Sequence, residues 1–204
     1  MTVRIAPIVE GDGECEAVPI LVRRIASEID PRFVPLILRP YPAPTTRLLK
    51  TGEIERAVET AGRKLQGQGG ILVIVDCDHK NGCPAIDAPA LLTRAKRARK
   101  DLPISVVLAK REFEAWFLAA AESLRGKRGL PEDLSSPPNP EDIRGAKEWL
   151  SAKMSPGQGY AETTDQAALT ALFDMKAARR ADSFDKCYRE IRGLLCLLRG
   201  SPNA

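Results

Sequence analysis

Four short apolar runs constrain the fold of this chain more than any other feature. They cover residues 5–9, 33–38, 71–75 and 104–108, and segments with helical spacing of apolar residues lie between them. Buried strands of a parallel sheet read as continuous apolar runs, and the crossovers that join parallel strands are usually helices. The pattern therefore predicts an α/β fold in which helices flank a mainly parallel sheet.

The composition of the chain changes after residue 125. Gly, Pro, Ser and charged residues fill residues 126–140, and helical patterns follow near 141–153, 165–178 and 184–198. We expect an α/β core over residues 1–125 and a helical extension over residues 126–204 that packs on it. The apolar contacts of this extension are expected from Trp149, Leu169, Leu172, Phe173, Phe184, Leu194 and Leu198.

Cysteine content and hydropathy narrow the cellular setting. The chain has 204 residues and five cysteines, an odd number without a CxxC pair, which argues against both a disulfide framework and a zinc site. The first residues are too soon polar for a signal peptide, and no apolar run reaches membrane-spanning length. We expect a cytoplasmic protein with no membrane partner.

The first candidate site residue is Glu10, which follows the run at residues 5–9. Glu10-Gly-Asp-Gly-Glu14 has glycines that allow a sharp turn from strand to helix, with Glu10 at the strand tip. The alternative is a simple turn that carries a solvated acid.

The second candidate is the pair Asp76 and Asp78, which directly follows the run at residues 71–75. Residues two apart in extended chain project to the same side, so both carboxylates can face one hard cation. The alternative is a pair of turn aspartates. Ligands of open α/β sheets bind beyond the carboxyl ends of the strands, where Glu10 and both aspartates are expected.

The third candidate is Lys110-Arg-Glu-Phe-Glu-Ala-Trp116, which follows the run at residues 104–108. Because positions i and i+2 diverge on a helix, Glu112 and Glu114 cannot both face the site from a regular helix. The alternative is a charged helix surface with its aromatic residues packed inward. His79, the only histidine, adjoins the aspartate pair and has no assigned role. Neither a GxSxG elbow nor a phosphate-binding P-loop motif is present.

The ordered set of these motifs resembles the Toprim domain of topoisomerases, bacterial primases and overcoming-lysogenization-defect nucleases. The matching residues are Glu10 in IVEGDGE and the two aspartates in VIVDCD. Small bacterial Toprim-like proteins also share the stretch Arg111–Trp116 and the downstream Tyr160, Thr164-Asp165-Gln166 and Asp182-Ser-Phe184. The resemblance covers residues 3–122 for the domain and extends over the whole chain for the smaller group.

The resemblance implies particular roles for these residues. Asp76 and Asp78 would bind Mg²⁺, with Mn²⁺ as the alternative ion, and Glu10 would serve as ligand or general acid/base. Glu114, and with less support Glu112, would match the late glutamate of the nuclease branch. Nucleases of this type often work with an ABC-like ATPase, which here would be a separate chain.

We therefore expect a Mg²⁺-dependent phosphodiesterase or nuclease that acts on nucleic acid, as the effector of an anti-phage system. Lys110 and Arg111 would stabilise the developing phosphoryl charge. A basic helix would follow the phosphate backbone or be merely solvated; its residues are Arg94, Lys96, Arg97, Arg99 and Lys100. The alternatives are a non-catalytic metal-binding regulatory subunit of a partner ATPase and a phosphotransferase that acts on a small phosphate ester. The sequence does not distinguish a DNA substrate from an RNA substrate, one metal ion from two, or a monomer from a homodimer.

Overall fold

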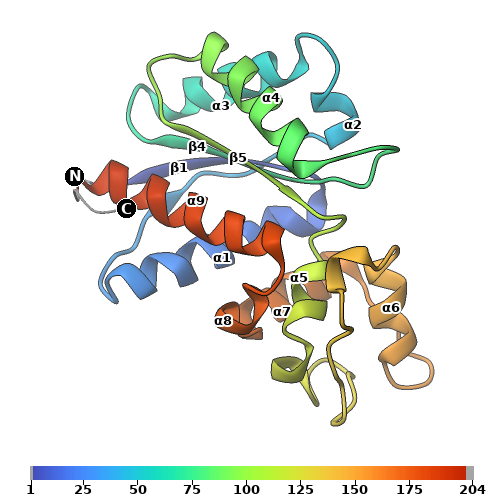
Figure 1. Cartoon of the computed structure of the whole chain (residues 1–204). Helices are drawn as coiled ribbons and strands as arrows, with labels where there is room; N and C mark the ends of the chain where they lie inside the picture. Colours follow the sequence, from blue (N-terminus) through green and yellow to red (C-terminus); the bar gives the residue numbers. More distant parts are fainter. Residues whose placement is uncertain (1, 201–204) are drawn as a thin grey trace.

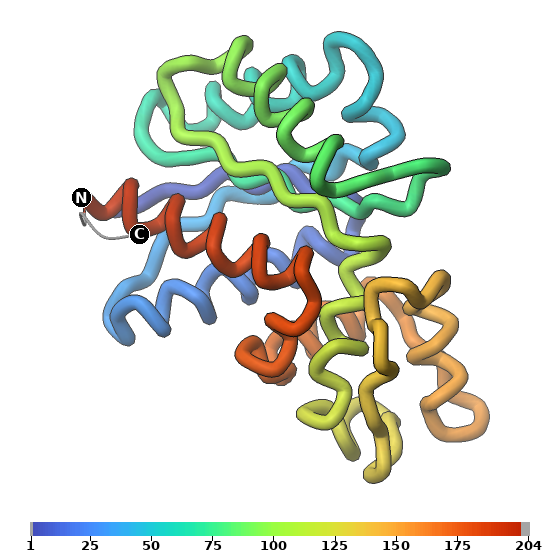
Figure 2. The backbone as a smooth tube through the Cα atoms, in the orientation of Figure 1, coloured from blue at the N-terminus to red at the C-terminus, as the bar shows by residue number. Residues whose placement is uncertain are grey.

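The computed structural model describes residues 2–200 and consists of a parallel sheet between two layers of helices (Figures 1 and 2). The strands are β1 (Arg4–Val9), β2 (Leu36–Ile37), β3 (Tyr41–Pro42), β4 (Gly70–Asp76) and β5 (Ile104–Ala109). All pairings are parallel in the order β2-β1-β4-β5, and β3 continues the pairing along β1. The predicted α/β class is confirmed.

The helices of the α/β core alternate with the strands, and further helices follow β5. They are α1 (Asp12–Ile29), α2 (Thr45–Leu48), α3 (Glu53–Leu65), α4 (Pro84–Ala98), α5 (Ala115–Ala119), the 3₁₀ turns η1 (Ala121–Leu124) and η2 (Pro140–Asp142), α6 (Ala146–Lys153), the π-turn η3 (Glu162–Gln166), α7 (Ala167–Leu172), α8 (Met175–Ala178) and α9 (Asp182–Arg199). Within residues 2–200, no helix is both long enough and apolar enough to cross a bilayer.

The apolar runs end where the sequence predicts, except in the second run. There the expected strand over residues 33–38 is only the two-residue β2, followed by the two-residue β3. Pro35 and Pro40 bracket β2 and have no backbone N–H to donate to a ladder, so the edge pairing stays short. The inner strand β4 and the edge strand β5 are buried at every position, as continuous apolar runs require.

Each face of the sheet has its own apolar core. Helices α3 and α4 cover one face, and α1 and α9 cover the other (Figure 1). The last helix, α9, packs along β5, so the end of the chain returns to the sheet. The core on the α1 and α9 face continues without a break into residues 113–178.

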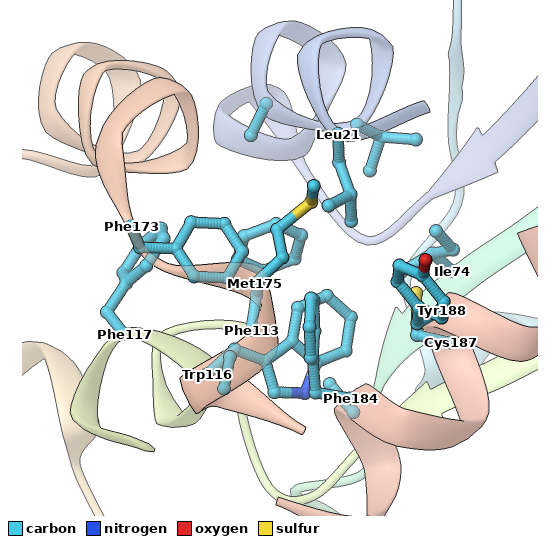
Figure 3. Packing of buried hydrophobic residues seen from close by; sticks show 14 of the residues in the cluster. Leu21, Ile74, Phe113, Trp116, Phe117, Phe173, Met175, Phe184, Cys187 and Tyr188 are labelled. Atoms are coloured by element: carbon cyan, nitrogen blue, oxygen red, sulfur yellow. The ribbon is translucent and has the colours of Figure 1, made fainter. Parts of the chain in front are cut away.

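An aromatic cluster joins the segment after β5 to the carboxyl-terminal third of the chain (Figure 3). Trp116 of α5 packs edge-on against Phe184 of α9 at 5.3 Å between ring centroids, and its Nε1–H donates to Ser183 Oγ at 2.9 Å. Phe173 packs against both Phe117 and Phe184. These contacts fix the start of α5, where Glu114 lies. Of the residues expected to pack the extension, Leu172 is instead 47% exposed.

Candidate metal centre

Glu10 and Asp76 meet at the carboxyl edge of the sheet because β1 and β4 are neighbours. The carboxylate of Glu10 accepts the backbone N–H of Asp76 at 3.1 Å. It also accepts the backbone N–H and the hydroxyl of Thr45, each at 2.9 Å. The Thr45 hydroxyl lies 2.6 Å from the carbonyl oxygen of Asp76, which completes the link between the two strand ends. Burial raises the pKa of Glu10, although these hydrogen bonds oppose the shift.

Asp76 is the buried centre of this edge. Its side chain is turned into the protein, where Oδ1 accepts the backbone N–H of Phe113 at 2.9 Å. Loss of water raises the pKa of Asp76 well above its ordinary value, and the nearby carboxylates of Glu114, Glu14 and Glu10 raise it further. The ionised form of Asp76 therefore lacks sufficient compensation from the protein alone.

Glu114 and Glu14 extend the cluster from two other elements. Glu114 precedes α5 and is fully buried, and its Oε1 accepts the Tyr160 hydroxyl at 2.8 Å. The side-chain amide of Gln166 donates to both glutamates, at 2.6 Å to Glu14 and 3.1 Å to Glu114. Burial raises the pKa of Glu114 to about 7, so this carboxyl group changes protonation near neutral pH.

Lys147 of α6 supplies a positive charge beside the cluster. Its ammonium lies 2.7 Å from Glu162. Burial would lower the pKa of Lys147, but the carboxylates of Glu114, Glu162 and Asp76 outweigh that effect and raise it. Lys147 thus supplies one ammonium to a site that contains the carboxyl groups of Asp76 and Glu114.

Asp78 stands on the exposed side of the same edge. Its side chain is open to solvent, and its charge contributes to the raised pKa of Glu10. The structure thus brings Glu10, Asp76 and Asp78 to one edge of the sheet. Within residues 2–200, however, no three of the carboxylates at this edge have ligand atoms that all lie within 4.8 Å of one another, so their side chains would have to move to share one cation. Strand β5 lies beside β4, as predicted, which brings Glu114 to the site.

Two residues of the third motif are placed elsewhere than the sequence suggests. Glu112 turns toward α6, where its Oε1 accepts the backbone N–H of Gly145 at 3.2 Å. The ammonium of Lys110 lies 3.3 Å from Asp142, outside the carboxylate cluster. The positive charge at the cluster comes from Lys147 instead. Arg111 lies beside the end of β4, where its backbone carbonyl accepts the N–H of Cys77 at 2.9 Å.

The basic helix α4 does not carry its charges toward the site. Arg94 is engaged inside the fold by both oxygens of Glu55 at 2.8 Å. Arg99 pairs with Asp101 and Glu59. Because α4 crosses back between two parallel strands, its carboxyl-terminal half lies at the opposite edge of the sheet from Asp76. The exposed Lys96, Arg97 and Lys100 share that position, so the predicted path for a phosphate backbone along α4 does not lead to the carboxylates.

The donor set of this cluster fits a hard divalent cation. Within residues 2–200, Glu114 Oε2 and Gln166 Oε1 are buried oxygens without a hydrogen-bond donor. Carboxylate and amide oxygens are the ligands that Mg²⁺, Mn²⁺ and Ca²⁺ prefer. A cation among them would satisfy these oxygens and offset the repulsion between the carboxylates.

Several residues of the site have no role in the sequence prediction. Thr45, Lys147, Tyr160 and Gln166 all contact or face the carboxylates, and Glu14 is buried among them. Gln166 lies on the π-turn η3, a distortion that is frequent at functional sites. An irregular turn has no periodic pattern that could predict this region from the sequence. The one signal for it is the resemblance to small Toprim-like proteins, which includes Tyr160 and Thr164-Asp165-Gln166.

The fold and the site define an α/β protein with a carboxylate cluster at the carboxyl edge of a parallel sheet. The chain belongs to the family described as Domain of unknown function (DUF4276), whose profile matches residues 9–192. That range contains every carboxylate of the cluster together with Lys147, Tyr160 and Gln166. Searches of curated proteins and of solved structures found no match.

Proposed function

We propose that this protein is a Mg²⁺-dependent phosphodiesterase that cleaves nucleic acid. The observation that carries the proposal is the convergence of Glu10, Asp76 and Glu114 at one sheet edge, with Asp78 on its exposed side and a buried Glu114 oxygen that lacks a donor. The Toprim resemblance supports the same reading, because its glutamate and paired aspartates correspond to residues at this edge. Mn²⁺ is the alternative ion.

The residues of the cluster divide the work between holding charge and moving protons. Asp76 and Asp78 would hold the cation from the buried and the exposed side. Once bound there, Mg²⁺ would polarise a scissile phosphate and lower the pKa of an attacking water. Glu10 is fixed by Thr45 and by the Asp76 amide, and burial raises its pKa, which suits a group that accepts and returns a proton.

Cations near the exposed side of the site would receive the phosphate backbone. Lys80 is exposed two residues after Asp78, and Arg111 follows β5. The formal net charge of +4 permits a polyanionic substrate. These residues replace α4 as the proposed contact surface.

The wider setting is proposed on the resemblance alone. It includes a role as anti-phage effector and a separate ABC-like ATPase as partner, and it leaves a homodimer open. A cytoplasmic location is proposed because all five cysteines are free thiols, which a reducing compartment preserves.

Burial favours one competing function. Asp76, Glu14 and Glu114 are each at most 5% exposed, an arrangement that also suits a metal held for structure in a non-catalytic subunit. A phosphotransferase acting on a small phosphate ester is the other alternative, because such a substrate needs less access than a nucleic acid does.

Cleavage assays separate these functions. Tag-free protein is incubated with plasmid DNA, single-stranded DNA, tRNA and bis(p-nitrophenyl) phosphate, in Mg²⁺, in Mn²⁺ and in EDTA. The proposal predicts metal-dependent cleavage of a nucleic acid that Asp78→Asn abolishes and Asp133→Asn retains, since Asp133 is an exposed acid of the extension. No cleavage with either metal, or unchanged cleavage by Asp78→Asn, would contradict it.

A further inference from the structure

A second group of metal-binding side chains lies next to the carboxylate cluster but does not belong to it. Cys77, His79 and Asp87 each place one ligand atom within 4.8 Å of the others. Cys77 and His79 flank Asp78 in the chain, and Asp87 is on the first turn of α4. These residues offer sulfur, nitrogen and oxygen, whereas the carboxylate cluster offers oxygen.

Two separations between these atoms are close to the edges of a tetrahedral coordination sphere. His79 Nε2 lies 3.3 Å from Asp87 Oδ2, and Cys77 Sγ lies 3.9 Å from the same oxygen. Bonds of about 2.0–2.1 Å to nitrogen and oxygen and about 2.3 Å to sulfur give tetrahedral edges of about 3.3 Å (N···O) and about 3.5 Å (S···O). The observed N···O separation equals the expected edge, and the S···O separation closes with a small side-chain movement.

The loop around the three residues packs closely against their side chains and holds them in place. A side chain at Gly82 would lie 2.9 Å from Cys77 Sγ and 2.7 Å from His79 Cε1, so only glycine fits over the cluster. The backbone N–H of Cys83 donates to Asp87 at 2.8 Å and holds that carboxylate in place. Within residues 2–200, His79 Nδ1 is a buried nitrogen without a hydrogen-bond partner.

We propose that Cys77, His79 and Asp87 form a binding site for a borderline-soft divalent cation of the Zn²⁺ class. A thiolate, an imidazole and a carboxylate together select Zn²⁺ or Co²⁺ over Mg²⁺. The sequence has no CxxC pair and so gives no sign of a zinc site. The ligands proposed here are instead a cysteine and a histidine two residues apart, together with an aspartate from the first turn of α4.

A nucleophilic role for the same three residues fits the structure less well. A Cys–His–Asp set activates a thiolate in some enzymes, and that thiolate must be exposed to its substrate. Cys77 is 1% exposed, and its Sγ lies against Asp87, an acid that disfavours the thiolate. A bound cation would remove that conflict, because a coordinating thiol is deprotonated outright.

A cation at this site would fix the loop that presents Asp78. The backbone on both sides of Asp78 would then be anchored through Cys77 and His79, and Asp87 would anchor the loop to α4. The site is independent of the proposed phosphodiesterase activity, since its ligands and its preferred ion differ from those of the carboxylate cluster.

Metal binding to tag-free protein tests the site without any activity assay. Chelator-treated protein is titrated with Co²⁺ and followed by the thiolate-to-cobalt charge-transfer absorption, and Zn²⁺ is then added in competition. We expect saturation near one equivalent of Co²⁺, displacement by Zn²⁺, and no effect of millimolar Mg²⁺.

Variants locate the ligands. His79→Asn and Cys77→Ser should each weaken Zn²⁺ binding at least about tenfold, whereas Cys15→Ser, which removes a thiol from α1, should bind like the wild type. Circular dichroism verifies that each variant is folded. If Cys77→Ser does not fold, His79→Asn decides the question, because His79 is only half-buried. Absence of the charge-transfer band in the folded wild type, or wild-type affinity in folded His79→Asn, would overturn the proposal.

Discussion

Asp76 and Glu114 are carboxylic acids that the fold removes from water, and the charge of Glu114 acts on Asp76. In the absence of a cation, the protein lowers the cost of their burial partly by protonation, which is why their pKa values are raised. A divalent cation competes with those protons, so metal binding should strengthen as the pH rises through neutrality. Metal binding should therefore release protons from the carboxyl groups of the cluster.

The pH dependence of stability tests the burial of Glu114. A carboxyl group whose folded pKa lies above its unfolded value stabilises the protein below the unfolded pKa, and that contribution is lost as the pH rises through the folded pKa. For Glu114 the window runs from about 4.5 to about 7. Urea unfolding in EDTA should show that Glu114→Gln becomes more stable relative to wild type across this window, by at most about 3 kcal/mol. A difference that does not change with pH would contradict the burial argument.

Asp78 should behave as a functional residue rather than a structural one. It is exposed and carries a charge that opposes the other carboxylates, so Asp78→Asn should leave the metal-free protein at least as stable as wild type. The variant should gain less thermal stability from added Mg²⁺, because stabilisation by a ligand follows its affinity. Melting curves with and without Mg²⁺ give the comparison, with Asp133→Asn as control. A destabilised variant with an unchanged response to Mg²⁺ would show that Asp78 is structural.

At the scale of elements, the site is built both from regular strands and from short helices that follow an irregular segment. Strands β1, β4 and β5 are continuous apolar runs, so the sequence predicts their ends and, with them, the placement of Glu10, Asp76 and Glu114. Helix α6 and the π-turn η3 follow a long irregular segment, so nothing in the local sequence predicts that Lys147 and Gln166 reach the same edge. Likewise, Arg94 resembles a surface cation in sequence, and only the position of Glu55 on α3 shows that it is used inside the fold.

The π-turn should be required for the integrity of the cluster. Gln166→Leu keeps the apolar bulk but removes the amide that donates to Glu14 and Glu114. Two buried carboxylates would lose a donor, which should cost roughly 2–4 kcal/mol of unfolding free energy. Urea unfolding should show this loss, whereas Gln68→Leu, at an exposed turn, should change stability by less than about 0.5 kcal/mol. Equal stability of the two variants would mean that the bridging amide contributes little.

At the scale of the whole molecule, the two parts that the composition suggests share one apolar core. The change in composition after residue 125 predicts a core and an extension packed on it, and α9 covers β5 while one apolar core runs through both parts. The sequence could not predict this, because an amphipathic helix does not specify which apolar surface it covers. The α/β class and the edge of the sheet that carries the site, by contrast, follow from strand order and crossover geometry.

A shared core implies a single unfolding transition. Trp116 lies in α5 near the sheet and Trp149 in α6, so tryptophan fluorescence follows the carboxyl-terminal region while far-ultraviolet circular dichroism follows all helices. Both signals should give the same urea midpoint. Two separate midpoints would mean that the segment after β5, which carries Trp116 and Trp149, unfolds independently of the sheet.

The central claim is that the carboxylates at the edge of the sheet hold a divalent cation. Anomalous diffraction from crystals soaked in Mn²⁺ tests it most directly, because the ion locates itself and the ligands are read from its position. We predict a manganese peak among Glu10, Asp76, Asp78 and Glu114, which is absent from crystals of Asp76→Asn. Manganese found only elsewhere on the protein, or an unchanged peak in the variant, would contradict the claim.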